Sequence, residues 1–225
     1  MNREDIQQVI NDREKYKAGV RQKSQTKSID TSQTVIVGYK GSGKTLLQTI
    51  LAYHFFKNKP FWSNFWLLPQ AFPQVLDFNL PDFYKNPNVK GLFLDEAHTI
   101  ANQFSSGSLT SQVLTGLLSQ SRKHNQFICI STIEFNWLAK DIRLSTDYLV
   151  KPFIDLKRDR LYFSIWDVQT DLNNFKTFCV KNVSQYYKLY DTKFVVISTE
   201  LENKIKKIVV KQTKINKEFY EVIGK

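Results

Sequence analysis

Residues 38–45 constrain the fold of this chain more than any other stretch, because they read Gly-Tyr-Lys-Gly-Ser-Gly-Lys-Thr. The apolar, β-branched run at residues 34–37 predicts a buried strand directly before them. A glycine-rich loop that leads from a strand into a helix turns its backbone N–H groups toward phosphate oxygens, and the helix N-terminus adds a favourable dipole. The stretch therefore predicts a nucleoside triphosphate site. Apolar residues at helical spacing predict the helix that follows: Leu46, Leu47, Ile50, Leu51 and Phe55.

Every residue of this loop is a candidate ligand of ATP, and two have separate expected roles. Lys44 is expected to reach the β- and γ-phosphates, and Thr45 is expected to place its hydroxyl on Mg²⁺. ATP and Mg²⁺ are therefore the predicted cofactors. The full set of candidate ligands is Gly38, Tyr39, Lys40, Gly41, Ser42, Gly43, Lys44 and Thr45.

A second motif follows about fifty residues later, where an apolar run at residues 89–94 ends in Asp95 and Glu96. In P-loop enzymes the first acid at this strand end supports Mg²⁺ through its water shell, and the second can polarise the attacking water. We assign Asp95 to the metal and Glu96 to the general base. A further strand at residues 61–68 lies between the two motifs. This order favours an ATP-hydrolysing motor over a small-molecule phosphotransferase, which stays as an alternative.

The pattern of apolar runs predicts an α/β fold of the P-loop NTPase class, with a mainly parallel central sheet flanked by helices. Residues 69–88 carry four prolines and are expected to form a long loop with at most a short helical turn. The ATPase core is expected to span residues 33–170. Its later elements are expected as a helix at 109–121, a strand at 127–130, a helix at 136–143, a strand at 146–150 and a β-hairpin at 153–167 that turns at 155–159.

Two terminal segments flank this core. Residues 1–32 predict a helical extension with a linker, and residues 171–225 predict a basic, helical extension that packs on the core or on a neighbouring subunit. Residues 176–225 hold eleven lysines and five acidic residues, within a chain of net charge +11. This surplus favours a polyanionic partner, nucleic acid before membrane. No apolar stretch resembles a signal peptide or a transmembrane segment, so a soluble protein is expected.

Three further residues at the strand 127–130 bear on the site or its surroundings. Ser131 and Thr132 follow the strand, at the edge of an open α/β sheet that faces a ligand, so either could sense the γ-phosphate or form an ordinary turn. Cys129 lies within the apolar run and is expected to be a small core residue of a reduced, intracellular protein.

The order of the motifs resembles that of the HerA–FtsK superfamily of DNA-pumping ATPases. The likeness rests on residues 38–45, the single intervening strand, residues 92–98, the basic cluster 121–124 before one strand, and residues 141–143 before the next. Within that superfamily the chain is most similar to the genome-packaging ATPases of membrane-containing icosahedral viruses, including the archaeal turreted type. The resemblance covers about residues 30–170.

This resemblance implies a hexameric ring that threads double-stranded DNA and packages a viral genome into a preformed capsid. It also implies an arginine that reaches the γ-phosphate of the neighbouring subunit, with Arg143 preferred and Arg122 as the second candidate. Family members often carry a glutamine after the fourth strand, where this chain has residues 131–134, so Thr132 or Ser131 would replace it. The implied location is the host cytoplasm, in association with the virion or procapsid, and the implied partner is a capsid or membrane protein at the packaging vertex.

One alternative shares the same core. A filamentous-phage assembly ATPase of the zonula-occludens-toxin type would have the same motifs, but those proteins usually carry a membrane-spanning segment, and none is visible in this sequence. The shared motifs therefore leave this alternative open, whereas the lack of a visible membrane-spanning segment disfavours it.

Overall fold

The computed structural model describes residues 32–77, 86, 88–99, 116, 121, 123–168 and 171–191, with the backbone alone for residues 171–174. The chain divides into two compact units, Met1–Phe194 and Val195–Lys225, and every described residue belongs to the first. The predicted helix at 109–121, the N-terminal extension and the amphipathic C-terminal segment fall almost wholly outside the described residues. Within these residues no helix has the length and apolar character needed to cross a membrane.

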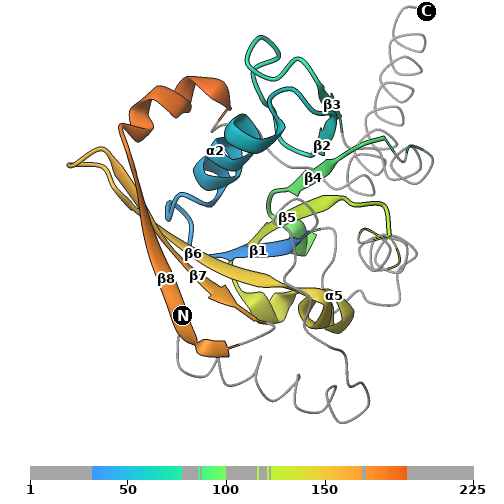
Figure 1. The fold of residues 1–225 in the computed structure, drawn as a ribbon. Coiled ribbons are helices and arrows are strands. Elements are labelled where there is room, and N and C mark those ends of the chain that lie inside the picture. The colour runs from blue at the N-terminus through green and yellow to red at the C-terminus, as the bar shows by residue number, and fades with distance from the viewer. Residues whose placement is uncertain are drawn as a thin grey trace, which may run out of the picture. The chain divides into compact units, whose positions relative to one another are not determined.

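The described part is built on one sheet with the strand order β3-β2-β4-β5-β1-β6-β7-β8 (Figure 1). Pairing is parallel from β3 through β6 and antiparallel from β6 through β8. The predicted fold class, a mixed α/β fold with a mainly parallel sheet, is confirmed. The strands are β1 Gln33–Val37, β2 Phe61–Ser63, β3 Val75–Asp77, β4 Gly91–Leu94, β5 Phe127–Thr132, β6 Tyr148–Asp155, β7 Arg160–Asp167 and β8 Asp171–Lys181.

Helical elements pack on both faces of this sheet (Figure 1). α2 begins directly after the glycine-rich loop and buries Leu46, Leu47 and Ile50, as the spacing predicted. The far end of the predicted stripe differs, because Phe55 is 45% exposed and Phe56 is buried instead. α5 lies on the opposite face, with Ile142 fully buried. The helical elements of the described part are α2 Lys44–Phe56, α5 Lys140–Ser145 and the 3-10 helices η2 Ala97–Thr99, η4 Phe135–Trp137 and η5 Val183–Leu189.

The two faces of the sheet have different cores because side chains alternate along each strand. On the α2 face, Phe56 packs its ring 5.2 Å from the ring of Phe127 and 5.4 Å from that of Phe93. The packing of this cluster requires glycine at position 91, since a Cβ there would lie 2.9 Å from the Phe56 ring. On the α5 face, aliphatic residues of β1, β4 and β5 form a second cluster with residues of β6, η4 and α5. The carboxyl ends of the parallel strands are thereby held at one edge.

The predicted strands at β1, β4, β5 and β6 are present, and the predicted hairpin turns at residues 156–159 between β6 and β7. Four elements differ from the predictions. The strand expected at residues 61–68 is present only as the three residues of β2. The loop at residues 69–88 contains β3, which has only three residues and therefore no readable alternation. The expected helix at 136–143 is divided, because Leu138 is extended (φ −76°, ψ 148°) between η4 and α5. β8 was not predicted, and it extends the sheet beyond residue 170; the division of the chain at that residue stays a prediction.

Candidate nucleotide-binding site

The loop between β1 and α2 has the backbone that its glycines permit. Gly41 and Gly43 adopt positive φ angles of 82° and 94°, a region that other residues rarely enter. A Cβ on Gly43 would also lie 2.8 Å from Leu161 Cδ1 of β7, so position 43 requires glycine for its φ angle and for its surroundings. A Cβ on Gly38 would lie 2.6 Å from Ser42 Oγ. The loop is therefore tightly curled and packed against the β6–β7 hairpin.

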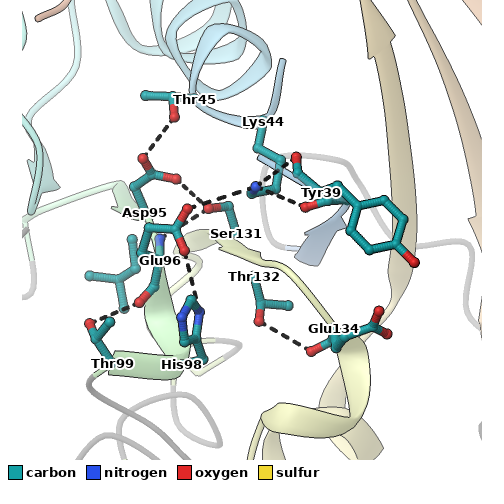
Figure 2. Close-up of polar contacts among 12 residues, drawn as sticks. Tyr39, Lys44, Thr45, Asp95, Glu96, His98, Thr99, Ser131, Thr132 and Glu134 are labelled. Atoms are coloured by element: carbon teal, nitrogen blue, oxygen red, sulfur yellow. Dashed lines mark hydrogen bonds and ion pairs between the residues drawn. The ribbon is translucent and has the colours of Figure 1, made fainter. Parts of the chain in front are cut away.

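Lys44, the first residue of α2, reaches back across this loop (Figure 2). Its side chain is only 5% exposed, and Nζ donates hydrogen bonds to the carbonyls of Gly38 at 2.8 Å and Tyr39 at 3.3 Å. Nζ also lies 3.7 Å from Glu96 Oε1. A buried ammonium group held by loop carbonyls and one carboxylate is placed where a phosphate chain cradled by the loop would need a positive charge.

Thr45 and Asp95 meet at the start of α2 and the end of β4. Thr45 Oγ1 donates a hydrogen bond to Asp95 Oδ2 at 2.7 Å, and Ser131 Oγ donates to the other oxygen, Asp95 Oδ1. Mg²⁺ prefers hard oxygen ligands and is usually bound by one or two protein groups together with water and substrate phosphates. A hydroxyl and a carboxylate oxygen 2.7 Å apart fit this preference, so the predicted donor pair for Mg²⁺ is brought together.

Glu96 lies between Lys44 and His98 at the same edge (Figure 2). Its backbone has φ 49°, and its N–H donates to Ser131 Oγ at 3.1 Å. One carboxylate oxygen faces Lys44, and the other lies 3.4 Å from His98 Nδ1, while the carboxylate is 35% exposed. The His98 ring stands edge-on to Trp137 with centroids 5.2 Å apart. His98 thus contacts the candidate general base.

Asn64, directly after β2, is a site residue that the sequence analysis did not single out. Its Oδ1 accepts a hydrogen bond from the Asp95 N–H at 2.7 Å, and its Nδ2 donates to the Asp95 carbonyl at 2.9 Å. Its own N–H donates to the Phe93 carbonyl at 3.2 Å. The amide thus fixes both peptide units of Asp95, and the second of these leads into Glu96. The sequence signal that could have identified Asn64 is a polar amide at the end of the strand beside β4.

Gln48 is a second residue that the sequence analysis missed. It lies on the buried side of α2 with 0% exposure, and its Nε2 donates to the carbonyls of Leu94 at 3.0 Å and Cys129 at 3.3 Å. It therefore joins the helix of the phosphate loop to the two strands that carry the acidic pair and Ser131. Cys129 is fully buried, as predicted, and burial raises the pKa of its thiol. The signal for Gln48 was a polar residue within an apolar helical stripe.

The two sensor candidates occupy different positions. Ser131 contacts both acidic residues, by donating to Asp95 and accepting from the Glu96 N–H. Thr132 is fully buried, and its Oγ1 donates to the Glu134 carbonyl at 3.1 Å. Ser131 therefore holds the acidic pair in place, whereas the Thr132 hydroxyl bonds within its own turn. A γ-phosphate-sensing role stays a prediction for both residues.

The two arginine candidates are not brought to the phosphate loop of their own chain by any described contact. Arg122 lies outside the described residues. Arg143 lies on α5, and its Nη1 donates to Asn136 Oδ1 at 3.3 Å. The adjacent carbonyl of Ile142 accepts a hydrogen bond from Gln33 Nε2 at 3.4 Å, and Gln33 begins β1 at the end opposite the phosphate loop. The roles of both arginines stay predictions.

Replacing Asn64 with Ala tests whether the amide positions the acidic pair. We expect kcat for ATP hydrolysis to fall by about 10- to 100-fold with KM nearly unchanged, because small displacements of catalytic groups act on the chemical step. The free energy of unfolding should fall by about 1–3 kcal/mol, since two backbone groups of Asp95 lose their partner. The exposed Asn88, changed to Ala, is the control. A rise in KM at constant kcat would assign Asn64 to binding instead.

Comparisons with known proteins identify solved structures that are similar to this chain. No family model matches the sequence, and no curated protein is similar to it at a significant level. Among solved structures, the N-terminal domain of zonular occludens toxin from Neisseria meningitidis is similar with a TM-score of 0.53 and 18% identity, over 72% of this chain and 99% of that one. The genome packaging NTPase B204 from Sulfolobus turreted icosahedral virus 2, in complex with ATP-gammaS, matches with a TM-score of 0.45 and 16% identity, over 67% and 98%.

Fold and site together define the class: this chain has the P-loop NTPase fold, with its phosphate loop and acidic strand end in place. The similarity to the Neisseria domain confirms the P-loop NTPase fold, and membership of the HerA–FtsK superfamily stays a prediction.

Proposed function

We propose that this protein hydrolyses ATP and uses the energy to move double-stranded DNA. The observation that carries the hydrolysis step is the convergence of Lys44, Thr45, Asp95 and Glu96 at one edge of the sheet, with separations of 2.7 Å between Thr45 and Asp95 and 3.7 Å between Lys44 and Glu96. A protein that binds a triphosphate without hydrolysing it would need only Lys44, Thr45 and Asp95. Glu96, a part-exposed carboxylate beside the phosphate loop, adds a base that can take a proton from water.

Each side chain has one task in this proposal. Lys44 binds the β- and γ-phosphates and stabilises the negative charge that develops as the terminal phosphoryl group leaves. Glu96 orients the attacking water and accepts its proton. Thr45 and Asp95 would hold Mg²⁺, which when bound neutralises charge on the phosphate oxygens. Asn64 and Ser131 keep the backbone and carboxylate of Asp95 fixed, so that the neighbouring Glu96 does not have to reorganise during the reaction.

The coupling to DNA is supported by charge and by motif order. A net charge of +11 would favour the binding of a phosphate backbone. Arg143 lies on α5 with its guanidinium bonded to Asn136 of η4, and in this proposal it acts on the phosphate of a neighbouring subunit. In this proposal the chain forms a ring, with a hexamer as the expected form, and packages a viral genome at a capsid vertex in the host cytoplasm. A capsid or membrane protein at that vertex would be its partner.

DNA binding is expected to depend steeply on salt. A protein that contacts 6–10 phosphates loses about 10³–10⁵ in affinity between 50 and 200 mM salt, because condensed counterions are released on binding. We therefore expect fluorescence anisotropy with duplex DNA and an ATP analogue to show a loss of at least about 10³-fold over this range. Light scattering on the same samples gives the oligomeric state.

Two outcomes would contradict parts of this proposal. ATP hydrolysis without salt-dependent DNA binding in any oligomeric state would remove the translocase function and leave an ATPase with another task, such as filamentous-phage assembly. A persistent monomer with both ATP analogue and DNA would remove the role of an arginine from a neighbouring subunit.

A further inference from the structure

The sheet order determines the direction in which a triphosphate must lie in the phosphate loop. The loop follows β1, and the acidic residues and Ser131 come from β4 and β5, on one side of β1. β6, β7 and β8 lie on the other side. In Figure 2 the side chains of Asp95 and Glu96 lie on one side of Lys44, and Tyr39 lies on the other. A γ-phosphate placed at the acidic pair therefore directs the nucleoside away from it, over β6, β7 and β8.

The face of these three strands that meets the loop is identified by contacts. A Cβ on Gly43 would meet Leu161 of β7 and Ile154 of β6, and a Cβ on Gly38 would lie 3.9 Å from Pro152 Cδ. The strand register places Pro152 opposite Phe163, and Phe163 opposite Phe178 of β8. Directly opposed residues share a face of a sheet. Phe163 and Phe178 therefore lie on the same face as the phosphate loop, one and two strands outward from Pro152, at about 5 and 10 Å.

These two phenylalanines, which we term the aromatic shelf, form a stacked pair. Their ring centroids are 5.5 Å apart with an interplanar angle of 20°, so the rings are nearly parallel and stack on one another, which leaves the outer face of each ring free of its partner. Phe178 is 45% exposed, although it belongs to a row that begins at the buried Pro152. An exposed aromatic face beside a phosphate loop, on the side toward which the nucleoside must extend, suits a planar base.

We propose that the aromatic shelf binds the purine base of the triphosphate by stacking, with Phe178 as the outer contact. The inference rests on the proposed function, because it requires that the loop holds a nucleoside triphosphate. Stacking uses the π-face that all bases share, so the shelf contributes affinity for the nucleoside and adds nothing to the binding of the phosphate chain.

The test compares a ligand that has a base with one that does not. Calorimetric titration of the full chain with Mg²⁺ and a non-hydrolysable ATP analogue is set beside titration with inorganic tripolyphosphate. For Phe178→Ala we expect about tenfold weaker binding of the ATP analogue, in line with base–aromatic stacking, and unchanged binding of tripolyphosphate. Phe178→Leu, which keeps an apolar side chain without a π-face, should show the same loss of ATP analogue affinity.

Phe175 offers a matched control on the same strand. It is 56% exposed and its ring lies 5.3 Å from that of Trp166, but it is on the opposite face of β8. Phe175→Ala should bind both ligands as the unmodified chain does. Equal losses for Phe175→Ala and Phe178→Ala, or no loss for Phe178→Ala and Phe178→Leu, would overturn the inference while leaving ATP binding intact. Failure of the unmodified chain to bind either ligand would instead overturn the proposed function.

Discussion

Exchange of Glu96 for Gln is expected to lower kcat for ATP hydrolysis by about 10²–10⁴-fold, the usual contribution of a positioned general base. The amide keeps the size of the side chain but cannot accept the proton of the attacking water. Binding of ATP should persist, because the phosphate contacts come from Lys44 and the loop backbone. The measurement combines phosphate release at saturating ATP with titration of a non-hydrolysable analogue.

The distances around Glu96 sharpen this expectation. Its carboxylate lies 3.7 Å from Lys44 and 3.4 Å from His98, so the substitution also removes a negative charge between two basic groups. Asp77→Asn is the control, because Asp77 is an exposed acid at the end of β3, at the same edge of the sheet, and the exchange changes the net charge equally. Hydrolysis by the Glu96→Gln variant within about fivefold of the unmodified rate would show that another group activates the water.

The parts of the site that were predicted from the sequence are those encoded in short contiguous runs. The phosphate loop needs glycines, Lys44 and Thr45 within eight residues, and the acidic pair needs only a strand that ends in Asp95 and Glu96. The contacts that fix this pair come from elsewhere in the chain. Asn64 follows β2 and Ser131 ends β5, and only the order β2-β4-β5 places both beside Asp95. No local pattern encodes that neighbourhood.

The strands β8 and β3 were missed because their side chains show no readable alternation. β8 is the edge of the sheet, and its described side chains from Phe175 to Cys179 are exposed on both faces, so the hydrophobic alternation that marks a half-buried strand is absent. Its lysines and asparagines gave the composition of a solvated extension instead. β3 is too short for any period to be read. The shelf residue Phe178 was hidden by this error, because its neighbour across the sheet could not be assigned without β8.

Substitution of Lys44 by Ala is the second change with a large expected effect. We expect kcat/KM for ATP to fall by about 10³-fold or more, since removal of a single donor to a developing charge in a water-excluded site costs 10²–10³-fold and the contact with bound phosphate is lost as well. The Lys44 ammonium is buried and donates to two loop carbonyls, so no mobile surface cation can take its place. Phosphate release and calorimetric titration with ATP analogue measure the two effects separately.

The control for this variant is Lys57→Ala, because Lys57 flanks the other end of α2 and its Nζ lies 5.0 Å from the Tyr53 ring, away from the phosphate loop. It removes the same charge without touching the site, and it should hydrolyse ATP at the unmodified rate. Thermal unfolding separates lost chemistry from lost structure. The Lys44→Ala variant should unfold within a few degrees of the unmodified chain, because removal of a buried ammonium also removes its desolvation cost. A folded Lys44→Ala variant that retains more than about a tenth of kcat/KM would show that the loop does not hold the triphosphate through this residue.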